Sequence, residues 1–229
     1  MEKSKKSHWI KQEQDNSGRR IGLFGASGCG KTTKSRELIQ NANRLIVFDS
    51  ILGEWRDNCK KWLSGGVVVD TMIDLKKEVL KRWYKGFKIV FVPRFAKEKK
   101  QLDEVARYIL AIQSGYGLTH NAKLTFLIDE AQECIPSGTA QTWANHGALM
   151  IARLGRKKGI NALFLSQRLH TVDINVRANL DYTYFFRLEE LSDINEANQI
   201  IHDKQGLLTM KNFDYYYKAG GQIKFFKKS

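Results

Sequence analysis

One segment of the sequence combines glycines, a lysine and threonines at the spacing that phosphate binding requires. It fits the pattern G-x-x-x-x-G-K-[ST] and comprises Gly25, Ala26, Ser27, Gly28, Cys29, Gly30, Lys31, Thr32 and the following Thr33. Glycines allow successive backbone N–H groups to point inward, and the dipole of a following helix adds positive partial charge. We predict that Lys31 contacts the β- and γ-phosphates and that the Thr32 hydroxyl holds Mg²⁺. The segment therefore indicates a site for ATP and Mg²⁺.

Two adjacent carboxylates follow an apolar run that has the composition of a buried strand, 123–129. Ligands of parallel sheets bind at the carboxyl ends of the strands, so Asp129 is expected beside Thr32 in the Mg²⁺ shell. We predict that Glu130 polarises the water that attacks the γ-phosphate. The alternative is that Glu130 only begins the next helix, where acidic residues are favoured.

Two polar residues, Gln167 and Arg156, flank the strand predicted at 161–167, one at its end and one shortly before its start. Gln167 ends it at the same sheet edge as Asp129 if the two strands are neighbours, and we predict that its amide senses the γ-phosphate; an ordinary polar strand end is the alternative. Arg156 precedes the strand, so it lies at the opposite end of the sheet and cannot easily reach its own nucleotide. It could reach the nucleotide of a neighbouring subunit in a ring, with Arg153 as the reserve candidate. A cationic helix end is also favoured by the helix dipole without any further role.

Short β-branched runs alternate with longer amphipathic stretches along the chain. Strands are predicted at 20–24, 44–49, 66–70, 87–93, 123–129, 161–167 and 182–187, and helices at 31–41, 72–84, 97–114, 139–156 and 192–203. This alternation predicts an α/β fold, with a mostly parallel sheet covered on both faces. Residues 213–228 read as a β-hairpin added to the edge of the sheet.

Composition limits the remaining possibilities. The 229 residues fit one domain, which we place at 19–229 after a basic arm at 1–18. A formal charge of +14 favours a polyanionic partner such as nucleic acid, although a charged surface also serves solubility. The sequence shows neither a transmembrane segment nor a signal peptide, so we expect a cytoplasmic protein.

The segment Lys76–Lys100 holds ten Lys or Arg and two Glu, with Trp83, Tyr84, Phe87 and Phe95 among them. Basic groups neutralise phosphates and aromatic rings stack on bases, so this segment is a candidate DNA contact; a solvated cationic face is the alternative. The three cysteines are odd in number and unevenly spaced, which predicts reduced thiols. Cys29 is better explained as a small tolerated residue than as a redox switch.

Four segments of the sequence together resemble the FtsK–HerA superfamily of P-loop ATPases. They are the phosphate-binding segment, the Asp129-Glu130 strand end, the Gly-Arg-Lys-Lys-Gly turn and the Ser-Gln-Arg strand end. The resemblance covers about residues 20–190. It implies an additional-strand, RecA-like three-layer sandwich that acts as an oligomeric ring on double-stranded DNA. A stand-alone ATPase of this size is similar to the genome-packaging ATPases of tailless icosahedral viruses with an internal membrane. The winged-helix, membrane-anchor and barrel domains of other members have no counterpart in the sequence.

The resemblance therefore predicts an ATPase that packages viral double-stranded DNA into a preformed capsid. It would work in the host cytoplasm or with the virion, next to a capsid-vertex or membrane protein. Two other functions stay open: a P-loop phosphotransferase such as a nucleoside kinase, and an ATPase for filamentous virus assembly or conjugative DNA export. The Glu that follows Asp129 favours water over a substrate hydroxyl as the nucleophile, and no arginine-bearing lid is evident.

Overall fold

The computed structural model describes residues 18–50, 53–116, 123–138 and 146–228. The predicted basic arm, apart from Gly18, and the first part of the predicted helix at 139–156 lie outside these residues.

Within the described residues, nine strands form one sheet in the order β3-β4-β2-β5-β6-β1-β7-β8-β9. The strands from β3 to β7 in this order are all parallel, whereas β8 and β9 form an antiparallel hairpin beside β7. The strands are β1 Arg20–Phe24, β2 Arg44–Asp49, β3 Val67–Val69, β4 Phe87–Phe91, β5 Leu124–Asp129, β6 Ile160–Ser166, β7 Tyr182–Phe186, β8 Tyr215–Ala219 and β9 Gln222–Phe226. The predicted α/β fold with a C-terminal hairpin is thereby confirmed.

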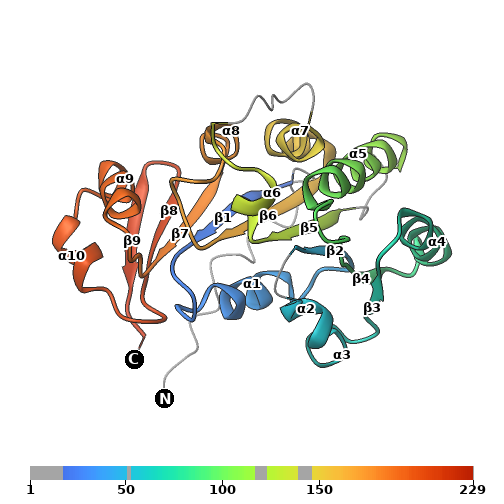
Figure 1. Cartoon of the computed structure of the whole chain (residues 1–229), viewed down its shortest axis with the longest axis horizontal. Helices are drawn as coiled ribbons and strands as arrows, with labels where there is room; N and C mark the ends of the chain where they lie inside the picture. Colours follow the sequence, from blue (N-terminus) through green and yellow to red (C-terminus); the bar gives the residue numbers. More distant parts are fainter. Residues whose placement is uncertain (1–17, 51–52, 117–122, 139–145, 229) are drawn as a thin grey trace, which may run out of the picture.

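Helices cover both faces of this sheet, as Figure 1 shows, with α1 to α3 on one side and α5 to α8 on the other. Their bounds are α1 Lys31–Ile39, α2 Glu54–Asp57, α3 Cys59–Trp62, α4 Met72–Arg82, α5 Glu98–Tyr116, α6 Ala131–Cys134, α7 Gly147–Leu154, α8 Ile174–Arg177, α9 Leu191–Ile201 and α10 Lys204–Thr209. In the described part of the chain, no helix combines the length and apolar character needed to span a bilayer.

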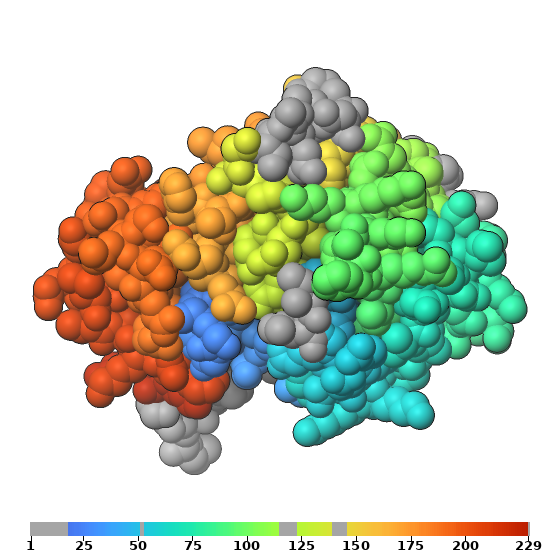
Figure 2. Space-filling view, viewed as in Figure 1, coloured from blue at the N-terminus to red at the C-terminus, as the bar shows by residue number. Residues whose placement is uncertain are grey.

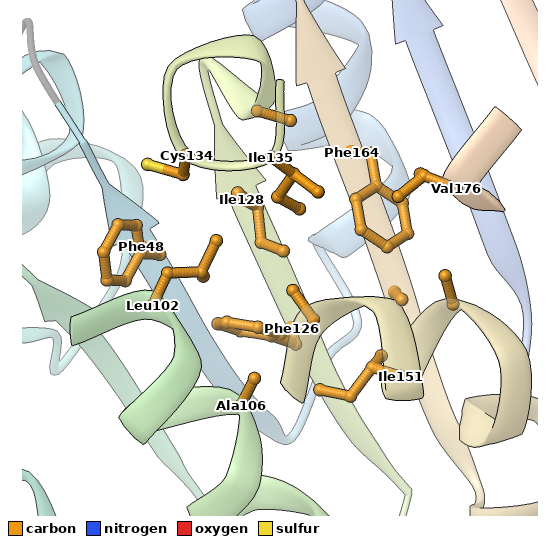
Figure 3. Close-up of a cluster of buried hydrophobic side chains, with 14 of the residues drawn as sticks. Phe48, Leu102, Ala106, Phe126, Ile128, Cys134, Ile135, Ile151, Phe164 and Val176 are labelled. Carbon is orange, nitrogen blue, oxygen red and sulfur yellow. The ribbon is translucent and has the colours of Figure 1, made fainter. Parts of the chain in front are cut away.

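Alternate residues of the central strands enter two separate cores. On β5, Phe126 and Ile128 face the core beneath α5 and α7, while Leu127 belongs to the core on the α1 side. Figure 3 shows the first of these cores, in which Phe126 lies close to Leu102 of α5 and Ile151 of α7. Burial on both faces explains why the central strands read as continuous apolar runs.

The main departure from the predicted elements lies before β6. The single helix expected at 139–156 ends at Leu154 in the structure, and a tighter 3-10 turn, Gly155–Lys158, follows it. Gly159 closes that turn with φ 67°, a conformation that suits glycine. Arg156 is therefore held in a tight turn at the amino edge of the sheet.

Candidate nucleotide-binding site

The sheet order brings the predicted site together at one edge. Strand β6 lies between β1, which leads into the phosphate-binding loop (residues 25–33), and β5, which ends at Asp129. The Gly25 N–H donates to the carbonyl oxygen of Ser166 at 3.2 Å, so the loop starts beside the end of β6. The condition that β5 and β6 be neighbours is met, and Gln167 emerges at the same edge as Asp129.

The phosphate-binding loop wraps around the amino group of its lysine. Lys31 is buried, and its Nζ donates to the carbonyl oxygens of Gly25 at 2.7 Å and Ala26 at 3.0 Å. Gly28 and Gly30 have φ of 69° and 111°, in the region that favours glycine. Ser27, Gly28 and Thr33 are exposed, so the loop is open to a ligand on that side.

Cys29 is a packing residue of this loop. Its thiol is fully buried, and a Cβ on Gly25 would lie 2.8 Å from the Cys29 sulfur. Burial raises the pKa of the Cys29 thiol, and the Lys31 charge offsets this only in part. A raised pKa is the opposite of what a reactive thiol needs, so the structure favours the structural interpretation of Cys29.

Asp129 ends β5 as a buried carboxylate. Burial raises its pKa to about 7, with further contributions from the negative charges of Glu130, Asp49 and Glu54. A bound cation would favour the charged form of such a group, so the local chemistry suits a metal ligand.

Two of these acidic residues received no role in the sequence analysis. Asp49 ends β2, is paired in register with Asp129, and accepts a hydrogen bond from the Arg56 N–H at 2.8 Å. Glu54 begins α2 and accepts a hydrogen bond from Thr32 Oγ1 at 3.3 Å. The position of Asp49 at the end of a predicted strand could have placed it at this edge. Glu54 could not be placed in this way, because its position depends on a four-residue helix without a periodic signal.

The carboxylate of Glu130 is held by two amide groups. Gln167 Nε2 donates to one oxygen at 2.7 Å, and Gln132 Nε2 donates to the other at 2.7 Å. Glu130 occupies the N-cap position of α6 with φ 49°, yet its side chain makes no capping hydrogen bond. Its side chain therefore does not serve the helix start, and it is oriented by Gln132 and Gln167.

An open cavity of about 570 Å³ lies beside these groups. Ala26 of the phosphate-binding loop, Gln132, Gln167 and Arg168 contribute to its lining. In Figure 2, blue atoms from the early part of the described chain lie at the surface, between the orange C-terminal part and the yellow-green region of α6. Because Ala26 lines the cavity together with Gln132 and Gln167, the loop is accessible next to the amide groups that hold Glu130.

The oxygen groups of the site fit Mg²⁺. Among the described residues, no cluster of three His, Cys, Asp or Glu could hold a metal ion unaided. Mg²⁺ in nucleotide sites is usually held by one or two protein groups together with water and phosphate oxygens. Thr32 and Asp129, placed at one sheet edge, would supply such a partial set.

Arg156 lies at the far edge of the sheet. Its guanidinium is 57% exposed and stands 3.9 Å from Asp181, at the amino end of β7. Asp181 is paired mainly with Arg20, at 2.6 Å. Arg153 is also exposed, in the last turn of α7. Arg156 therefore lies away from the phosphate-binding loop of its own chain, as its position before β6 predicts.

The basic segment 76–100 divides its aromatic residues between core and surface. Trp83 and Phe87 are buried, whereas the side chains of Tyr84 and Phe95 are 87% and 95% exposed. Of these four aromatic rings, only those of Tyr84 and Phe95 are accessible for stacking on the bases of a nucleic acid.

No protein-family model and no curated protein sequence matches the chain. Solved structures do: the DNA-packaging ATPase B204 from Sulfolobus turreted icosahedral virus has a TM-score of 0.69 and 16% identity, over 93% of this chain and 98% of that one. The genome-packaging NTPase B204 of Sulfolobus turreted icosahedral virus 2, in complex with ATP-γ-S, has a TM-score of 0.68 and 16% identity, over 93% and 98% of the chains. VirB4 of Thermoanaerobacter pseudethanolicus has a TM-score of 0.66 and 13% identity, over 92% and 89%. The chain therefore has the fold of the FtsK–HerA-type P-loop ATPases.

Proposed function

We propose that the protein is an ATPase motor that hydrolyses ATP with Mg²⁺ and moves double-stranded DNA, packaging a viral genome into a preformed capsid. The observation that carries this proposal is the meeting of the phosphate-binding loop with Glu130 and Gln167 at one sheet edge. The similarity to two viral packaging NTPases over more than nine-tenths of both chains supports the biological setting.

Each side chain of the site then has a defined task. Lys31 holds the β- and γ-phosphates, and Thr32 and Asp129 hold the Mg²⁺ that neutralises phosphate charge. Glu130 orients and polarises the attacking water. Gln167, which donates a hydrogen bond to Glu130, would also contact a γ-phosphate oxygen of the bound nucleotide. Transition-state charge would be stabilised by Arg156 of a neighbouring subunit, since Arg156 lies far from its own loop.

The proposed partners follow from this mechanism. Sites completed by a neighbour require a homo-oligomer, and we propose that it is a ring, which DNA or the capsid could assemble. The charge of +14 suits double-stranded DNA in such a ring. We place the motor in the host cytoplasm or on the virion, next to a capsid-vertex or membrane protein.

The test is ATP hydrolysis by the purified chain over a range of protein concentrations, with and without double-stranded DNA. A motor with shared sites should show turnover that rises steeply with concentration and with DNA. Lys31→Ala should lower turnover by about 100-fold or more, because it removes the positive charge that stabilises the transferred phosphoryl group. Lys60→Ala, which removes an exposed lysine of α3 outside the loop, is the matched control.

Two results would contradict the proposal. Normal turnover in Lys31→Ala would remove the phosphate-binding role of the loop. Turnover that does not depend on concentration, and that needs a small phosphate acceptor, would favour the phosphotransferase alternative.

A further inference from the structure

Residues 211–214, between α10 and β8, lie directly against the phosphate-binding loop. The Phe213 N–H donates to the carbonyl oxygen of Cys29 at 2.8 Å. The Phe213 ring packs on Gly30 so closely that a Cβ at Gly30 would lie 2.7 Å from the ring. Substitution of Gly30 would therefore disturb both the loop and this contact.

This short segment is fixed from both sides. The buried carboxylate of Asp214 accepts hydrogen bonds from the N–H groups of Lys211 at 3.2 Å and Lys228 at 2.8 Å. The Asn212 side-chain oxygen accepts a hydrogen bond from Arg187 Nε at 2.7 Å. The carbonyl oxygen of Arg187 in turn accepts a hydrogen bond from the N–H of Ala26 in the loop at 2.8 Å.

Phe213 has a backbone conformation and an exposure that are uncommon for a large aromatic residue. Its φ is 72°, a left-handed conformation that is uncommon for a bulky residue. Its side chain remains 37% exposed, so core packing does not account for a large aromatic residue here. Strained backbone of this kind concentrates at functional sites, where the surrounding structure holds it in place.

The position of Phe213 relative to the loop indicates which part of a nucleotide it could meet. In the sheet order β6-β1-β7-β8, Gln167 follows β6 on one side of the loop, and Phe213 precedes β8 on the other. Gln167 and Glu130 mark the γ-phosphate end of the site. A nucleotide held by its phosphates has its base at the opposite end, which corresponds to the side of Phe213.

We propose that Phe213 is the stacking platform for the base of the bound nucleotide, an inference that rests on the proposed function. Every base has a π face that an aromatic ring can cover, and a purine offers the larger one. Lys228 Nζ lies over the Phe213 ring, 3.8 Å from its centre, so the cation covers one face of the ring and the base would stack on the opposite face.

Binding of two probes by calorimetry in the presence of Mg²⁺ tests the proposal. ATP-γ-S carries a base, whereas inorganic tripolyphosphate presents phosphates alone. Phe213→Ala should weaken ATP-γ-S binding by roughly 5- to 100-fold and leave tripolyphosphate binding unchanged, because only the base contact is lost. Phe213→Tyr should retain the affinity for ATP-γ-S. Phe95→Ala, which removes an equally large exposed ring outside the site, is the matched control.

The outcomes separate this inference from the function on which it rests. Equal losses for both probes in Phe213→Ala would mean that Phe213 only supports the loop, and no loss for either would mean that it contacts no base; both results overturn the platform. Failure of the unmodified chain to bind either probe would overturn the proposed function as well. If Phe213→Ala does not fold, as its melting temperature would report, Phe213→Leu keeps the apolar bulk without the aromatic face and should show the same selective loss.

Discussion

At the residue scale, the orientation of Glu130 is the feature on which hydrolysis would depend most closely. A carboxylate can polarise water only if it points at the water. Two amide groups, one on each oxygen, hold the Glu130 carboxylate in its orientation. Gln167 would also contact phosphate, whereas the Gln132 side chain, within the described part of the chain, is hydrogen-bonded to Glu130 alone. Gln132 is therefore a positioning residue, acting through Glu130.

Gln132→Ala should lower turnover by about 10-fold, the cost of one hydrogen bond to a charged group, while leaving ATP affinity unchanged. Steady-state kinetics would separate the two effects, since kcat falls and KM does not. Gln40→Ala, a change of an exposed glutamine after α1, is the control. A rise in KM with kcat unchanged would assign Gln132 to nucleotide binding.

A second residue-scale consequence concerns Asp129 and pH. Its pKa in the folded chain is about 7, whereas an unfolded chain has an Asp pKa of about 3.9. Between these values the folded state binds more protons than the unfolded state, so stability falls as pH rises. Burial raises the pKa of Asp49 in the same direction.

The melting temperature of the nucleotide-free protein should therefore decrease as pH is raised from about 5 to 8. Asp129→Asn removes the titrating group and should flatten this decrease. Addition of Mg²⁺ and ATP-γ-S should flatten it as well, because a cation favours the charged carboxylate. An unchanged slope in Asp129→Asn would show that other groups dominate the pH dependence.

At the element scale, the long alternating elements could be predicted because their periodicity is strong. Strands β1 and β2 begin and end where the sequence predicts, and the hairpin turns at Gly220 and Gly221 between β8 and β9. Short elements were missed: α2, α3, α6, α8 and α10 have four to six residues each and carry no periodic pattern.

The same distinction explains the site. Asp129, Glu130 and Gln167 could be placed at one edge because each follows a well-predicted strand. Glu54, Gln132 and Phe213 belong to short helices or a strained turn, and their proximity to the loop arises only from tertiary structure. Sequence periodicity contains no information about such contacts.

At the scale of the whole molecule, the sheet separates the nucleotide edge from the Arg156 edge. Asp181 anchors the latter: burial alone would raise its pKa, but hydrogen bonds and charge from Arg20 lower it, so it is ionised near neutral pH. Arg20 donates hydrogen bonds to both oxygens of this carboxylate, at 2.6 and 2.9 Å. Arg156 approaches Asp181 only to 3.9 Å, and its side chain stays more than half exposed. An exposed arginine opposite the nucleotide edge suits contact with the next subunit of a ring, in which one edge faces the other.

Mixing two inactive variants provides the corresponding test. Arg156→Ala should bind ATP but lose turnover by about 1,000-fold, and Glu130→Gln should also be inactive. In a mixed ring, an intact Glu130 from one variant can meet an intact Arg156 from the other, at about a quarter of the interfaces for equal amounts. ATP hydrolysis should therefore reappear on mixing in the presence of DNA. Glu130→Gln mixed with Lys31→Ala controls for assembly alone, because neither of these variants has an intact nucleotide edge. Persistent inactivity of the Arg156→Ala and Glu130→Gln mixture, together with recovery when Arg153→Ala replaces Arg156→Ala, would transfer the role to Arg153.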